Sequence, residues 1–273
     1  MTSAARARTP AYEDVVDLAR YPIGELDSAR GNALVRSCRE ELGANGVCQL
    51  PGFLTPQAVV EMVTQAGEGA SGAWATDREH TIYFEPVDES VSADHPRALQ
   101  QRSAKRAIAY DQISGDSPIR RLYESDDLTR FIAAVLGTQV LHRSADPLDA
   151  LEIAIFEDGE ELGWHFDRSE FSVTVMYQQS EYGGRFEYHP GLRSEQDENF
   201  RGVGRVLHGD HSGVVGLHSA PGTLAIFRGH DALHRVTPVS GPRPRINSVL
   251  TYGERDDMKL NELTQKLFYG RTA

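Results

Sequence analysis

Short strand-like segments, each closed by a turn signal, fill the sequence from about residue 138 onward. The segment 171–179, FSVTVMYQQ, alternates apolar and polar residues, and the segments 222–229 and 245–254 are further apolar runs bounded by glycine or proline. Alternation of this kind is typical of strands with one buried face. Because the helical patterns lie mostly before this region, a doubly wound parallel sheet is disfavoured. The sequence predicts an α+β fold with an antiparallel β-sandwich or jelly-roll barrel.

Helical patterns occupy much of the sequence before that region. Residues 27–46 carry apolar side chains at helical spacing and end in a glycine-bearing stop. A second helix is expected to begin at Thr55, whose hydroxyl can cap it, with Pro56 in the first helical position. These helices are expected to buttress the barrel from its N-terminal side.

Between the second helix and the barrel, the sequence predicts both strands and a helix. Residues 117–137 predict a further helix that is broken near Ser125. Strands are expected at 80–87 and 106–113, and the residues 88–105 that lead from one to the other are polar and predict a loop. Whether this loop closes over a site is left open by the sequence.

A chain of 273 residues can bury one large core and need not contain more than one domain. We expect a single domain over residues 1–273. Its expected parts are a partly mobile tail at 1–25, a mainly helical lead-in at 26–137, a jelly-roll core at 138–254 and a C-terminal helix at 255–273.

The charge and composition exclude several classes of partner. The formal net charge of −12 argues against a nucleic-acid backbone as ligand and is compatible with a small cationic substrate. No segment approaches the roughly 20 apolar residues that a membrane-spanning helix needs, and the first residues have no apolar signal core. The expected location is therefore cytoplasmic. Cys38 and Cys48 are expected to be buried or spectator thiols without a disulfide.

His165 and Asp167 stand two positions apart, just before the alternating segment. In extended backbone that spacing places both side chains on one face, where they can share a metal ion. A third ligand must come from elsewhere, and His230 and His234 are the downstream candidates. His230 can instead stabilise a turn together with Asp231. Two histidines and one carboxylate on one face leave open coordination positions, which is typical of non-haem Fe(II) oxygenases rather than of structural zinc sites.

The order of His165, Asp167, His234 and Arg245 resembles the HxD…H…R pattern of the Fe(II)/2-oxoglutarate-dependent dioxygenases. The flanking stretches GGRFEY, PGTLAIF and HRVTPVSGPRPRINSVLTY agree with it, and the resemblance covers roughly residues 148–254. It implies a double-stranded β-helix core, Fe(II) on His165, Asp167 and His234, and 2-oxoglutarate and O2 as co-substrates. It also implies that Arg245 binds the far carboxylate of 2-oxoglutarate.

Arg243 competes with Arg245 for this role. Arg243 lies between Pro242 and Pro244, which favour a position before the strand proper. Arginine suits the task because its planar fork binds a carboxylate through two hydrogen bonds.

A narrower resemblance concerns substrate and reaction. The chain length and the stretches WHFDRSEFSVT and RPRINSVLTY are similar to a bacterial family that acts on free amino acids and includes the lysine halogenases and related hydroxylases. In its halogenases, glycine replaces the HxD carboxylate and leaves room for chloride. Because this chain retains Asp167, the resemblance implies hydroxylation of a free amino acid such as lysine or a relative. Related enzymes are often dimers, so a homodimer is one alternative, but the sequence leaves the oligomeric state open.

Three residues are candidates for substrate contacts. Asn247 shares a strand face with Arg245 and either holds the substrate or is a satisfied core amide. Arg102, from the polar loop, either reaches over the mouth of the site or is a solvated charge. Trp164 either touches the substrate or packs beside the site.

Three other functions stay open on the sequence. The substrate could be a peptide or protein side chain instead of a free amino acid. A halogenase is disfavoured by Asp167. A non-catalytic jelly-roll binding module would keep the fold with a vestigial site.

Overall fold

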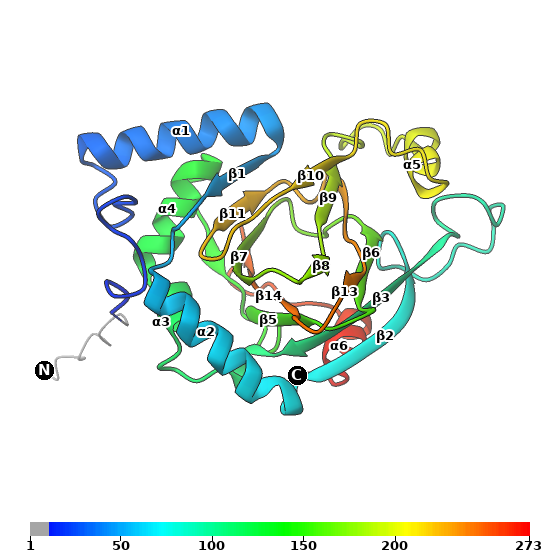
Figure 1. Cartoon of the computed structure of the whole chain (residues 1–273). Coiled ribbons are helices and arrows are strands. Elements are labelled where there is room, and N and C mark those ends of the chain that lie inside the picture. Colours follow the sequence, from blue (N-terminus) through cyan, green and yellow to red (C-terminus); the bar gives the residue numbers. More distant parts are fainter. Residues whose placement is uncertain (1–10) are drawn as a thin grey trace, which may run out of the picture.

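The computed structural model describes residues 11–273 (Figure 1). The helices are α1 (Ala29–Asn45), α2 (Pro56–Gly69), α3 (Pro118–Tyr123), α4 (Asp126–Leu136), α5 (Phe200–Leu207) and α6 (Glu262–Tyr269). The strands are β1 (Val47–Leu50), β2 (Trp74–Thr81), β3 (Gln100–Ile108), β4 (His142–Arg143), β5 (Leu151–Phe156), β6 (Glu161–His165), β7 (Ser172–Gln178), β8 (Tyr182–Gly183), β9 (Phe186–His189), β10 (Val215–Leu217), β11 (Leu224–Phe227), β12 (Leu233–Val236), β13 (Val239–Ser240), β14 (Arg245–Leu250) and β15 (Tyr252–Gly253).

An antiparallel sheet of 11 strands curls around a central space, with α1 to α4 on its outer side (Figure 1). Its main path is β1-β11-β7-β14-β5-β3-β6-β12-β9-β10, and β2 adds to the edge through β3. Consecutive strands of the chain are often not neighbours, as in a jelly roll. The α+β jelly-roll expectation is confirmed.

Alternation along the strands separates the inside of the barrel from the main core. On β5, Ile153 and Ile155 point outward into the core formed with the helices, whereas Ala154 and Phe156 belong to a separate inner cluster. This period of two is the reason that one strand can serve both the core and a central cavity.

The predicted helices of the first half form where expected. Ser28 caps α1, which ends at Gly46 with φ 73°, and Thr55 caps α2 with Pro56 in its first turn. The predicted break near Ser125 is confirmed, because Ser125 has extended backbone between α3 and α4.

Three elements differ from the sequence expectation. The strand expected at 80–87 is instead β2, which ends at Thr81, and β3 begins at Gln100, inside the expected loop. β2 is an edge strand with mostly exposed side chains, so it shows no apolar alternation. α5 was not expected, because Gly202 and Gly204 interrupt its pattern.

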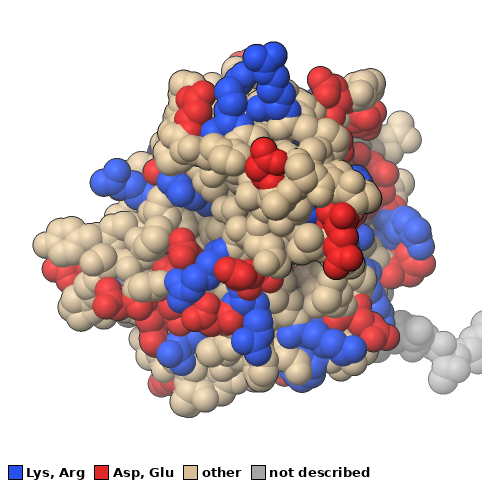
Figure 2. Space-filling model, turned by 90° about the vertical axis from the view of Figure 1, so that its right-hand side faces the viewer, with Lys and Arg blue, Asp and Glu red and all other residues tan. Residues whose placement is uncertain are grey.

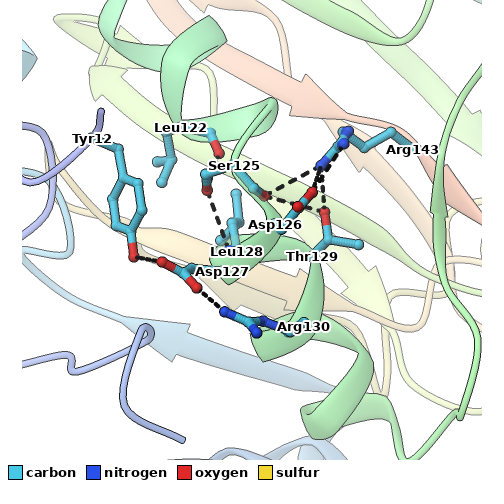
Figure 3. A network of polar contacts seen from close by, with 9 residues as sticks. All are labelled: Tyr12, Leu122, Ser125, Asp126, Asp127, Leu128, Thr129, Arg130 and Arg143. Carbon is cyan, nitrogen blue, oxygen red and sulfur yellow. Dashed lines mark hydrogen bonds and ion pairs between the residues drawn. The ribbon is translucent and has the colours of Figure 1, made fainter. Parts of the chain in front are cut away.

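Residues 11–25 of the expected partly mobile tail pack against the helices, while residues 1–10 lie outside the described residues. Val15 and Ile23 are fully buried, and the Tyr12 hydroxyl donates to Asp127 of α4 at 2.6 Å (Figure 3). Arg130 binds the same carboxylate. The segment from residue 11 onward is therefore packed against the helical layer.

Three expectations drawn from composition concern the cysteines, the charged residues and membrane-spanning helices. Cys38 and Cys48 are free and buried, as expected. Acidic and basic side chains intermingle over the face in Figure 2 instead of separating by sign. Within residues 11–273, no helix combines the length and apolar character needed to cross a membrane.

Candidate metal centre

The barrel brings His165, Asp167 and His234 together inside its wall. His165 is the last residue of β6 and is paired with His234 of β12 in the antiparallel ladder, while Asp167 follows two residues later. Asp167 Oδ1 lies 3.7 Å from Nε2 of His165 and 3.4 Å from Nε2 of His234. Potential ligand atoms of all three lie within 4.8 Å of one another. The three side chains thus converge on one point.

Each imidazole is oriented by a backbone carbonyl. Nδ1 of His165 lies 2.8 Å from the Gly163 carbonyl oxygen, and Nδ1 of His234 lies 2.9 Å from that of Ala232. A carbonyl oxygen only accepts, so each Nδ1 carries the proton and each Nε2 presents its lone pair. This is the arrangement that fixes metal-binding histidines.

The carboxylate is oriented as well. The Ser172 hydroxyl donates to Asp167 Oδ2 at 2.7 Å, which leaves Oδ1 directed at the two histidines. Burial tends to raise the pKa of Asp167, but His234, His165 and Ser172 outweigh it and hold the pKa below its ordinary value. Burial and the nearby His234 lower the pKa of His165 well below its ordinary value. Neutral imidazoles and an ionised carboxylate are the forms that bind a divalent metal.

The chemistry of this donor set fits Fe(II). Two nitrogens and one oxygen on one side of an ion form the facial set that leaves positions open for other ligands. A closed structural zinc site would need a fourth protein ligand, and the described residues gather three in this cluster.

A cavity inside the barrel extends from the three side chains to Arg245. Its wall is formed by residues of β3, β5, β6, β7, β11, β12 and β14 together with the segments around them, among them Lys105, Glu152, Phe156, Thr174, Thr223 and Asn247. Thr174 lies on this wall, whereas Tyr177 of the same strand lies in the outer core.

Arg245 is a buried cation without a carboxylate partner in the described chain. It is 5% exposed, its Nε has no hydrogen-bond partner, and one of its terminal nitrogens donates to Asn247 Oδ1. Burial lowers the pKa of Arg245 to about 10, so the guanidinium stays charged at neutral pH. An unpaired buried charge is costly. The cavity therefore calls for an anionic ligand at this end.

The other candidate residues lie elsewhere. Arg102 is on the outer side of β3, in ion pairs with Asp77 at 2.9 Å and Glu161 at 3.1 Å, and it does not line the cavity. Trp164 packs in a cluster on the outer side of β6, with the Arg235 guanidinium 4.5 Å from its ring centre. Neither position supports the expected substrate contact.

His230 and Arg243, the alternatives to His234 and Arg245, make structural contacts outside the cluster. His230 binds Asp231 at 2.8 Å, as the turn interpretation predicts. Arg243 precedes β14 and donates to the Ser180 carbonyl. Of the expected loop 88–105, only Lys105, which the structure places on β3, lines the cavity.

Sequence reasoning missed a buried ion pair in the cavity wall. Lys105 of β3 and Glu152 of β5 are 7% and 4% exposed and bind each other directly. The signal for Glu152 was available, because it shares strand parity with the inward-facing Ala154 and Phe156. A charge at that parity of an apolar strand indicates a polar cavity.

Comparison with known proteins identifies the family to which this chain belongs. A family model described as Halogenase D matches residues 31–268 of this chain. No curated protein matches.

Solved structures share the fold at low identity. The α-ketoglutarate-dependent epimerase SnoN of nogalamycin biosynthesis matches with a TM-score of 0.57 and 15% identity, over 82% of each chain. AviO1 of Streptomyces viridochromogenes matches with a TM-score of 0.56 and 15% identity, over 83% of this chain and 97% of that one. A prolyl hydroxylase from Trichoplax adhaerens matches with a TM-score of 0.52 and 15% identity, over 81% of this chain and 90% of that one. The fold is that of the 2-oxoglutarate-Fe(II) oxygenases.

Proposed function

The chain belongs to the halogenase D family, and on that premise we propose that it is an Fe(II)- and 2-oxoglutarate-dependent hydroxylase of a free amino acid. The observation that carries the proposal is one cavity with two oriented histidines and a carboxylate at one end and an unpaired buried guanidinium at the other.

His165, Asp167 and His234 would hold the iron, and Arg245 would hold the distal carboxylate of 2-oxoglutarate by a charge-assisted hydrogen bond. When bound, iron and 2-oxoglutarate supply an oxidation in which O2 is consumed, 2-oxoglutarate becomes succinate and CO2, and one oxygen atom enters a C–H bond of the substrate. Asn247 accepts from Arg245 and so limits the directions in which the guanidinium can point. The buried side chains around Arg245 exclude water from the anion.

The ion pair in the wall supports an amino acid as substrate. Lys105 and Glu152 offer one positive and one negative group to the cavity. A zwitterionic molecule carries the complementary pair, and polar groups buried in a site are best satisfied by a ligand that matches them. A basic amino acid, such as lysine or a relative, is the first candidate.

A screen of free amino acids under Fe(II), 2-oxoglutarate and air tests the proposal. We expect succinate formation to be stimulated by one or a few of them, with a product heavier by one oxygen atom. Asp167→Ala is expected to abolish hydroxylation, and full activity of this variant under limiting metal would refute the ligand assignment. Stimulation by a peptide alone would indicate a peptidyl hydroxylase.

Halogenation is the second candidate, because the family model carries that description. Asp167 opposes it, since its carboxylate fills the position that a halide would need. A chlorinated product from the unaltered protein in chloride buffer would overturn hydroxylation as the main reaction.

The homodimer is also a proposal, and its support is the resemblance to related enzymes alone. Light scattering of the purified protein is expected to give twice the monomer mass. A mass of one chain at all accessible concentrations would refute it.

A further inference from the structure

One tyrosine hydroxyl joins the C-terminal helix to two carboxylates of the barrel. The Tyr269 hydroxyl of α6 lies 2.7 Å from Asp149 Oδ1 and 2.9 Å from Glu152 Oε2. Tyr269 is buried, and Glu152 is the carboxylate that lines the metal cavity and binds Lys105. The contact therefore connects α6 to the cavity wall.

A single phenolic proton cannot serve both carboxylates. A phenol donates one hydrogen, whereas an ionised carboxylate only accepts. If Asp149 and Glu152 were both ionised, one of them would face the lone pairs of Tyr269 at hydrogen-bond distance with no proton between the oxygens. Two full-strength hydrogen bonds at 2.7 and 2.9 Å need two protons, so the geometry points to a second proton, held by one of the two carboxylates.

Asp149 is the group that holds this proton. Glu152 has the ammonium of Lys105 as a direct partner, which stabilises its ionised form. Asp149 has no cation in contact within the described chain, and its other donor is the Thr251 hydroxyl at 3.2 Å. Burial and the negative charge of Glu152 raise the pKa of Asp149 to about 7. A protonated Asp149 donates to Tyr269, which in turn donates to Glu152.

The surrounding charges agree with a neutral Asp149. Besides Lys105 and Glu152, the packed elements face this group with Asp146, which also raises the pKa of Asp149. Asp146 accepts hydrogen bonds from three backbone amides and the Gln265 side chain. The other charged groups close by form exposed ion pairs, Glu262 with Lys266 on α6 and Asp111 with Arg271 beyond it.

We propose that Tyr269 is a positioning residue, which passes a hydrogen bond from a protonated Asp149 to Glu152 and so fixes that carboxylate in the cavity wall. The consequence for substrate recognition rests on the function proposed above, whereas the relay itself does not. When Asp149 releases its proton to solvent at higher pH, the relay loses one hydrogen and Tyr269 can serve only one of the two carboxylates.

The pH dependence of stability tests the proton. A carboxyl group whose pKa is raised by folding stabilises the fold fully at low pH, and this contribution is lost as the pH rises toward the folded-state value. Asp149→Asn keeps a donor for Tyr269 but cannot ionise. We therefore expect the melting temperature of the unaltered protein, measured relative to Asp149→Asn, to fall between about pH 4 and pH 7, that is, between the ordinary and the raised pKa of the carboxyl group. A constant difference over that range would overturn the proposal.

Tyr269→Phe tests the relay independently, and this test remains available if Asp149→Asn does not fold. In the relay Tyr269 accepts from protonated Asp149 and so stabilises the protonated form, and its removal is therefore expected to move the midpoint of the stability change to lower pH. A crystal structure of this variant is expected to show a reoriented Glu152. Tyr12→Phe is the matched control, because it removes another tyrosine–carboxylate bond, at 2.6 Å, between residues that do not line the cavity (Figure 3). It is expected to lower the melting temperature equally at each pH.

An unchanged midpoint together with an unmoved Glu152 in Tyr269→Phe would refute the relay. Succinate formation by the unaltered protein in the screen of free amino acids reports on the proposed function separately. If it occurs and the pH effect is absent, the relay is wrong and the function stands. If the pH effect is present and no succinate forms, the function is wrong and the relay stands.

Discussion

Gly229 lies so close to Asp167 that any side chain in its place would collide with the carboxylate. A Cβ built on Gly229 would stand 1.7 Å from Asp167 Oδ2, and the Gly229 carbonyl accepts the Asp167 N–H at 3.1 Å. The need here is for close approach of backbone and carboxylate, one of the reasons for which glycine is used. This residue therefore sets the position of the proposed oxygen ligand.

Gly229→Ala is expected to displace Asp167 and to weaken divalent metal binding by about 10- to 100-fold, the usual cost of disturbing a group that orients a ligand. Titration with Mn(II), followed by calorimetry, measures this. Gly216→Ala is the control, because its Cβ would meet nothing within 4 Å. Equal affinities of the two variants would show that Asp167 does not bind the metal.

Asp167→Gly probes the difference between hydroxylation and halogenation. Removal of the carboxylate leaves His165 and His234 in place and empties the position between them and Ser172. We expect hydroxylation to be lost and, in chloride buffer, a chlorinated product to be detectable by mass spectrometry. Absence of chlorine from the product of this variant, under conditions in which it still binds metal, would contradict the expectation.

At the scale of elements, Ser125 determines where α3 ends and α4 begins. Its hydroxyl donates to the Leu122 carbonyl at 2.7 Å and accepts from the Leu128 N–H at 3.3 Å (Figure 3). One buried side chain thus satisfies the end of one helix and the start of the next. Because α4 packs against the same core as β5 and β14, the break also sets the angle at which the helices meet the barrel.

Ser125→Ala is expected to destabilise the protein by about 1–2 kcal/mol, the usual loss for an N-cap. Urea denaturation measures the free energy of unfolding. Ser117→Ala is the matched control, since Ser117 holds the same position before α3 without a side-chain capping bond. A smaller loss for Ser125→Ala than for Ser117→Ala would refute the capping role.

At the scale of the whole molecule, the cluster exists only when the barrel is closed. β6 and β12 are distant in sequence, and their pairing in the sheet puts His165 opposite His234. A ligand that binds the folded state alone raises its stability by mass action. Metal binding at this cluster therefore reports on the closure of the barrel.

Addition of Mn(II) or Zn(II) is expected to raise the melting temperature, by a free energy of about 2.7 kcal/mol when the metal is at 100 times its Kd. A chelator is expected to reverse the shift, and Asp167→Ala to abolish it. His208→Ala, which alters an exposed histidine outside the cluster, should retain it. Loss of the shift in His208→Ala as well would point to a different site.

Local patterns were enough for much of the fold and for the cluster. The cap at Thr55, the helix break near Ser125 and the alternation of 171–179 are local features, so they could be read without the structure. His165, Asp167 and His234 were found because a metal site needs particular residue types in a particular order. β2 and α5 were missed, since an exposed edge strand and a glycine-containing helix owe their conformation to tertiary contacts.

By itself, the sequence determined the residue types of the cluster, the class of fold and the retention of Asp167. Tertiary structure alone decided which charges face the cavity. The sequence left open whether Arg102 reaches over the mouth or is a solvated charge. Arg102 lies in outer ion pairs, whereas Lys105, three residues later on the same strand, lines the cavity. A strand turns successive side chains to opposite faces, and only its place in the closed sheet determines which face is the inside.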